Sequence, residues 1–153
     1  YDGGSKVDKR IINLLNKWDF LPICPEQLGG LPTPRPPAKF LQGDGDAAWQ
    51  NKAILQNENG DDVLPQYLHR AKEALKIAHL FDIRWALFKE KSPSCGPTRI
   101  HQNENYVRGM GITASLCRQN GIAVFSEEQL DLFLQKIQKT IITKNQKSII
   151  NPS

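Results

Sequence analysis

Two cysteines in this sequence lie where the packing of a core would not require them. Cys95 sits between two prolines in the segment SPSCGP, and Cys24 directly precedes a proline in the segment ICPE. Proline and glycine at this density exclude regular helix and strand around Cys95, so that thiol is expected on a rigid turn. Thiolates are good ligands for iron and zinc, although two of them alone make an incomplete metal site.

The remaining candidates for chemistry have ordinary structural explanations. Ser92 and Ser94 flank Cys95, and their hydroxyls could hydrogen-bond a bound sulfur or a substrate, or could only cap the turn. Cys117 falls inside an expected helix and is interpreted as a core residue. The three histidines have no metal-ligand spacing, and GDG at residues 43–45 is too short for a phosphate-binding loop.

Predicted strands and helices alternate along the sequence and determine where these cysteines lie. The expected strands are residues 20–24, which Pro22 weakens, and residues 83–88 and 122–125; the expected helices are residues 6–18, 61–80, 112–120 and 126–141. This order predicts a single α/β domain with a largely parallel sheet flanked by helices, Rossmann-like and three-layered. Ligands gather at the carboxyl ends of such strands, so Cys24 and Cys95 are expected to converge.

Two further segments are expected to lie outside regular structure or to turn sharply. Residues 27–40 form a proline-rich stretch that predicts an extended loop of polyproline character. Residues 43–49 predict a turn that leads into a hairpin with residues 52–56.

Composition limits the class of protein. The chain has 153 residues, 39% apolar and 24% charged, which is typical of a globular domain, and no run is long enough to cross a membrane. The net charge of +4 comes from lysines after Leu132, so we divide the chain into a domain at 1–140 and a basic tail at 141–153. A basic tail of this kind is most often a solvated face, and nucleic acid is not the expected partner. Three cysteines without a disulfide framework favour a reducing cytoplasm, and the oligomeric state is left open.

Several motifs together resemble a known family. YDGGSK at the start, CPEQLGGLPTPRPPA at 24–38, GDG at 43–45, LFKEKSPSCG at 87–96, and GMGITASL with NGIAVFSE within 109–127 carry the resemblance. They are similar to the domain-of-unknown-function family numbered 523, which includes bacterial thiouracil desulfidases. The resemblance covers residues 1 to about 128 of the sequence.

The resemblance implies a cofactor and a reaction. Members hold an oxygen-sensitive [4Fe–4S] cluster by only three cysteines, which leaves one iron open to the sulfur of a small thiolated nucleobase. The implied reaction is a non-redox desulfuration of that base, or of a similar small thioamide, that releases sulfide. Cys24 and Cys95 match two of the ligands. The third belongs to a segment of the form S-x-C-L-x-G before YDGG, so it is expected upstream of Tyr1, in a longer form of this protein.

The implied reaction also needs a proton carrier near the attacked carbon. Glu26, two residues from Cys24, is the first candidate, and Asp2 and Glu90 follow it. Ser92 and Ser94 would orient the base or the leaving sulfur. Each has an alternative: Glu26 could cap a turn, and Asp2 could belong to a disordered end.

One segment departs from the family pattern, and other functions remain open. After Cys95 the family commonly continues with a stretch like IYDGxFxG, whereas this chain has the shorter IHQNENYVRGMG, which leaves the choice of substrate open. The alternatives are a cluster-bearing sulfur carrier, and a binding module without a cluster that acts through the proline-rich loop or the basic tail. Electron transfer is disfavoured because such clusters usually have four protein ligands.

Overall fold

The computed structural model describes residues 8–15, 18–28 and 33–150, with the backbone alone for 141–150. Asp2, one of the proposed proton carriers, lies outside the described residues.

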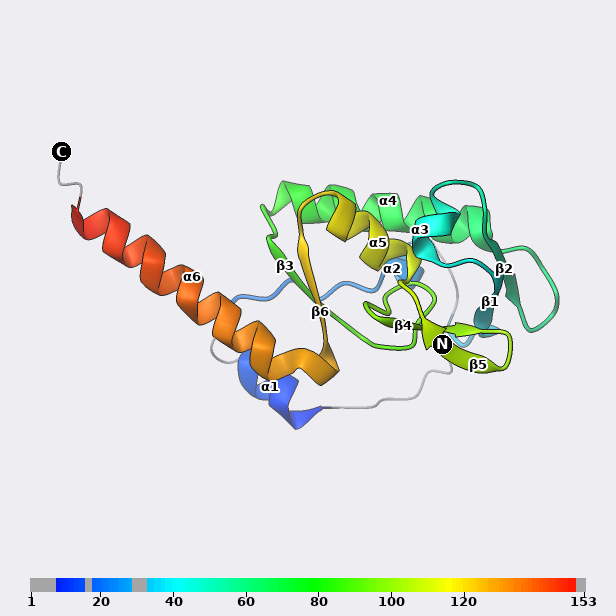
Figure 1. The fold of residues 1–153 in the computed structure, drawn as a ribbon, viewed down its shortest axis with the longest axis horizontal. Helices are drawn as coiled ribbons and strands as arrows, with labels where there is room; N and C mark the ends of the chain where they lie inside the picture. The colour runs from blue at the N-terminus through cyan, green and yellow to red at the C-terminus, as the bar shows by residue number, and fades with distance from the viewer. Residues whose placement is uncertain (1–7, 16–17, 29–32, 151–153) are drawn as a thin grey trace.

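Helices and strands alternate along most of the chain (Figure 1). The helices are α1 (Lys9–Leu15), α2 (Pro25–Leu28), α3 (Gly45–Ala48), α4 (Leu64–Leu80), α5 (Ile112–Gln119), the 3-10 turn η1 (Glu127–Gln129) and α6 (Leu130–Ile150). The strands are β1 (Ala38–Gln42), β2 (Ile54–Asn57), β3 (Trp85–Phe88), β4 (Arg99–Gln102), β5 (Asn105–Arg108) and β6 (Ala123–Ser126).

The strands of the described residues form two sheets of mixed character. One has the order β2-β1-β4-β5, in which β1 and β4 are parallel and both outer pairs are antiparallel. The other is the parallel pair of β3 and β6, with Trp85 opposite Ala123. The α/β class is therefore confirmed, but the prediction of a largely parallel sheet is wrong. The Rossmann-like three-layer arrangement stays a prediction.

The errors in the strand predictions have local causes. Residues 20–24 form no strand, because Pro22 has no N–H to donate to a ladder and the chain turns into α2 at Pro25. Strand β1 was hidden in the proline-rich stretch, whose last residues after Pro37 pair with β2 as one arm of a hairpin. Strands β4 and β5 form a second hairpin around Asn103, which has a φ of 51°. Asparagine tolerates this left-handed conformation, so the signal was present in the sequence.

The helix predictions agree better with the structure. Helix α4 begins at Leu64, whose N–H donates to the Asp62 carboxylate at 3.0 Å, and its inner face buries Ala71 and Ala78. Helix α5 ends before Gly121, which has the φ of +77° expected of a glycine stop. Helix α6 runs on to Ile150, past its predicted end, and projects away from the body of the fold (Figure 1). No helix in the described part of the chain combines the length and apolarity that crossing a bilayer requires.

Apolar side chains gather in three clusters. The largest lies between the four-stranded sheet and helices α4 and α5, around Phe40, Ile100 and Ile112. A second joins α1 to the first turns of α6, near η1, through Leu14 and Phe133. The third contains Cys117, which is 4% exposed and packs with neighbours from α4 and β6; its interpretation as a core residue is confirmed.

Candidate functional site

Cys95 lies on a loop that folds around the hydroxyl of Ser92. The Ser92 Oγ accepts the N–H groups of both Ser94 and Cys95 at 3.1 Å, and the Ser92 carbonyl accepts the N–H of Gly96 at 2.8 Å. These bonds are the turn-capping role that the sequence left as an alternative for Ser92. The turn fixes the direction in which Cys95 leaves the backbone.

The same loop closes the N-terminus of α5. The Pro93 carbonyl accepts the N–H of Ile112 at 2.9 Å, and the Ser94 carbonyl accepts the N–H of Thr113 at 2.8 Å. The buried Ser94 hydroxyl lies 3.1 Å from the hydroxyl of Thr113. The first N–H groups of a helix have no hydrogen-bond partner within the helix, and here the carbonyl groups of the loop accept them. Ser94 therefore holds the loop on the helix.

Close contacts of backbone explain three glycines that the family motifs contain. A Cβ on Gly96 would lie 2.3 Å from the Arg99 carbonyl oxygen, and one on Gly111 would lie 2.5 Å from the Ser94 carbonyl. Gly45, in the GDG motif, faces Gly111 in the same way, because a Cβ on Gly45 would lie 2.5 Å from the Gly111 oxygen. No other residue lets these backbones approach so closely. Gly45 of the GDG segment thus has a packing role, whereas the sequence had indicated only that GDG is too short for a phosphate-binding loop.

Glu90 fastens the other end of the Cys95 loop. It is 4% exposed, and its carboxylate accepts the N–H of Arg99 at 2.8 Å and both the N–H and the hydroxyl of Thr98 at 3.0 Å. Burial alone would raise the pKa of Glu90, but these hydrogen bonds outweigh it and the pKa is lowered. The contacts assign Glu90 to holding the loop and leave it no visible part in proton transfer.

The Glu90→Gln variant is expected to lose stability in a pH-dependent way. A carboxylate whose pKa is lower in the folded state stabilises the fold fully above its ordinary value of 4.5, and this stabilisation is lost as the pH falls through the folded pKa. We expect a loss of about 2 kcal/mol at pH 7, since an amide cannot replace the charged acceptor. Urea unfolding of both proteins between pH 7 and pH 3 tests this. A difference that stays constant down to pH 3 would contradict it.

Cys24 and Glu26 lie at the start of α2, which packs on α4. The Cys24 carbonyl accepts the N–H groups of Gln27 and Leu28 and so opens the short helix. Glu26 forms a largely buried ion pair with Arg35, whose Nε and Nη2 donate to the carboxylate at 2.8 and 2.7 Å. Burial raises the pKa of the Tyr67 phenol on α4, and the charge of Glu26 and a hydrogen bond to it raise that pKa further. The proposed proton carrier is therefore held by two side chains from other segments.

Neither cysteine follows a strand directly, and their convergence stays a prediction. The pKa of the Cys95 thiol is raised to about 12, chiefly by burial; a hydrogen bond from Ser94 acts to lower it, and the charges of Glu26, Cys24 and Cys117 act to raise it. A thiol of this kind is a poor free nucleophile at neutral pH, because only the thiolate reacts. A bound cation would reverse the balance, so the surroundings of Cys95 suit a metal ligand better than a nucleophile.

The donor set fits an iron–sulfur cluster in part. Within the described ranges no three histidine, cysteine or acidic side chains gather as a metal site, so Cys24 and Cys95 would be two ligands without a third. Both residues are partly exposed, and both thiols are free of disulfide bonds. A complete set needs a ligand from outside the residues that the structure describes.

Two arginines of the site were missed from the sequence. Arg35 is hidden among prolines in TPRPP, where nothing in the pattern marks its partner. Arg70 did leave a signal: it shares the buried face of α4 with Tyr67, Ala71 and Ala74, an apolar spacing that a cation interrupts.

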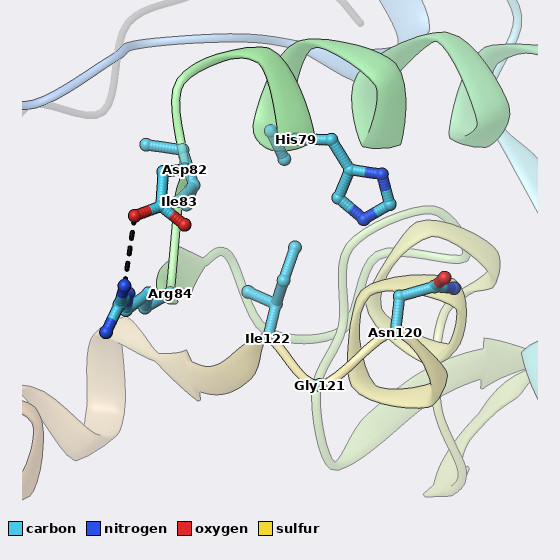
Figure 2. A pocket seen from close by; sticks show the side chains of 8 residues that line it. His79, Asp82, Ile83, Arg84, Asn120, Gly121 and Ile122 are labelled. Carbon is cyan, nitrogen blue, oxygen red and sulfur yellow. Dashed lines mark hydrogen bonds and ion pairs between the residues drawn. The ribbon is translucent and has the colours of Figure 1, made fainter.

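A separate pocket of about 430 Å³ lies where α4 and α5 end (Figure 2). Its polar lining comes from His79, Asp82, Arg84 and Asn120, and Asp82 pairs with Arg84 at 3.1 Å. None of the cysteines, and neither Glu26 nor Arg70, lines it. The pocket is therefore distinct from the site around Cys24 and Cys95.

The chain is similar to known proteins in sequence and in structure. Residues 1–129 match the family model described as 2-thiouracil desulfurase. A solved structure of the [4Fe–4S]-dependent thiouracil desulfidase TudS (DUF523) is similar, with 38% identity and a TM-score of 0.74 over 87% of this chain and 83% of that chain. An uncharacterized protein of Bacillus subtilis, YbbK, is 33% identical over 134 residues, which are 86% of this chain and 89% of YbbK.

Proposed function

We propose a function from the premise that the chain belongs to the 2-thiouracil desulfurase family: the protein removes sulfur from a small thiolated nucleobase or a similar thioamide. Water supplies the oxygen that replaces the thione sulfur, and the sulfur and the two protons of water leave as hydrogen sulfide. No electron is gained or lost in this exchange. The observation that carries the proposal is the rigid turn that presents Cys95, in which the Ser92 hydroxyl and the N-terminus of α5 fix the backbone around a thiol whose pKa is raised by burial.

Cys24 and Cys95 would hold two positions of a [4Fe–4S] cluster, with a third thiolate from outside the described residues, which the resemblance places upstream of Tyr1. When bound, the cluster supplies an iron that acts as a Lewis acid toward sulfur. The loop around Ser92 and Ser94 would fix Cys95 so that this ligand needs no rearrangement.

Glu26 would move protons between the attacking water and the departing sulfur. Its carboxylate is close enough to Cys95 to act on that thiol electrostatically, and the ion pair with Arg35 fixes its position. Ser92 and Ser94 remain candidates for orienting the substrate, but their hydrogen bonds support a role in holding Cys95. Asp2 keeps its place as an alternative proton carrier.

The experiment is a turnover assay on the full-length protein, reconstituted with iron and sulfide without oxygen. We expect 2-thiouracil to yield uracil and sulfide in equal amounts, and the protein without cluster to yield neither. A sulfur carrier would instead retain the sulfur after a single equivalent. A protein that takes up the cluster and then leaves a panel of thiolated pyrimidines unchanged would contradict the proposal.

A further inference from the structure

Arg70 is a buried cation whose hydrogen bonds are incomplete. It lies on α4 with 3% of its surface exposed, and its guanidinium is 5.3 Å from the centre of the Tyr67 ring. Its Nε and Nη1 are fully buried and meet no hydrogen-bond acceptor within the part of the chain that the structure describes. Buried guanidinium donors are costly to leave unpaired, so they indicate a missing acceptor.

The charges around Arg70 leave that acceptor to be supplied by a ligand. Arg70 lies on α4, the helix against which α2 with Glu26 packs. Burial lowers the pKa of Arg70, while the charges of Tyr67, Glu26 and Cys24 act to raise it. The carboxylate of Glu26 is already engaged by Arg35. Two arginines thus lie beside one acid, and this side of the site carries an excess of positive charge.

We propose that Arg70 binds anionic sulfur at this site, donating hydrogen bonds from Nε and Nη1 to sulfur beside Cys24. The inference rests on the proposed function, and it adds a residue that acts on the ligand. Two sources of such sulfur exist there: the cluster with its thiolate ligands, which carries net negative charge, and the sulfur that leaves the substrate. An apolar ligand would leave both donors unpaired, and a cation would be repelled.

The test compares full-length wild type, Arg70→Met and Arg70→Lys after anaerobic reconstitution with iron and sulfide. Arg84→Met is the matched control, because Arg84 is exposed, pairs with Asp82 and lies at the separate pocket. The readouts are the melting temperature of the cluster-free protein, the half-life of the cluster absorbance in air, and the KM for 2-thiouracil.

We expect the cluster-free Arg70→Met protein to melt no lower than the wild type, because an unpaired buried charge is removed. If the sulfur is that of the cluster, the half-life in air falls about tenfold or more; if it is that of the substrate, the KM rises by a similar factor instead. Arg70→Lys retains the positive charge but loses the planar set of guanidinium donors. Its half-life or KM is therefore expected to lie between the values of the wild type and of Arg70→Met.

Three results would overturn the inference. Arg70→Met could leave half-life and KM unchanged, it could match the Arg84→Met control in both, or it could melt far below the wild type without a cluster, which would assign Arg70 a partner within the protein. A wild-type protein that takes up no cluster would instead count against the proposed function. In that case, binding of hydrosulfide to the cluster-free protein still tests Arg70, with about tenfold weaker binding expected in Arg70→Met.

Discussion

Replacing Cys95 by serine is expected to leave the full-length protein without a stable cluster and without detectable release of sulfide from 2-thiouracil. A hydroxyl is a far weaker ligand for iron than a thiolate, and a cluster with three protein ligands has none to spare. Cys24→Ser is expected to have the same result. Iron content, absorbance after anaerobic reconstitution and sulfide release measure the effect.

Cys117→Ala is the control for both cysteine variants. Cys117 is buried among Ala78 and Ile122, so its loss removes one small apolar group and costs about 1 kcal/mol of stability. The cluster and the activity should remain. If Cys117→Ala lost the cluster while Cys95→Ser kept it, the ligands would have been assigned wrongly.

Replacing Glu26 by glutamine is expected to lower kcat by about 10²- to 10⁴-fold, which is the usual contribution of a positioned proton carrier. Glutamine has nearly the same shape and still accepts hydrogen bonds from Arg35, but it cannot take up a proton. The cluster should still assemble, because Glu26 is not among the proposed ligands. The measurement is kcat of both proteins at pH 7, each normalised to its measured cluster content.

Loss of the ion pair with Arg35 also destabilises the fold, so the kinetic result needs its own controls. Arg35→Lys keeps a charge beside Glu26 but weakens the pairing, and it should lower the melting temperature with a much smaller loss of kcat than Glu26→Gln. Glu128→Gln removes an exposed acid paired with Arg99 and should change neither property. A kcat that is the same in Glu26→Gln and wild type would remove Glu26 from the proton path.

The sequence predicted the local backbone around Cys95 better than it predicted how the fold builds the site. Prolines and glycine around Cys95 indicated a rigid turn, and the structure contains that turn. This prediction needed only local sequence, because proline restricts the backbone whatever surrounds it. Cys24 was placed after a strand that does not form. The positions of the two thiols depend on the packing of α2 on α4 and of the Cys95 loop on α5, which are tertiary contacts with no local pattern.

The role of several polar residues also depended on contacts between distant segments. The Ser94 hydroxyl, a candidate for orienting substrate, lies beside that of Thr113, and the carboxylate of Glu90, a candidate proton carrier, accepts hydrogen bonds from the loop. A single sequence does not show which partner a hydroxyl or carboxylate will find. Arg70 differs, since a cation on the apolar face of α4 is visible from spacing alone.

The backbone contacts around Gly96 and Gly111 make the two cysteine positions unequal for protein engineering. The segment that carries Cys95 is tied to α5 by main-chain hydrogen bonds and leaves no volume for an added methyl group, so it does not accept insertions or larger neighbours. The main-chain bonds at Cys24 stay within its own short turn. A redesigned site, for another metal or a larger substrate, should therefore keep residues 92–98 unchanged and diversify the chain around residue 24.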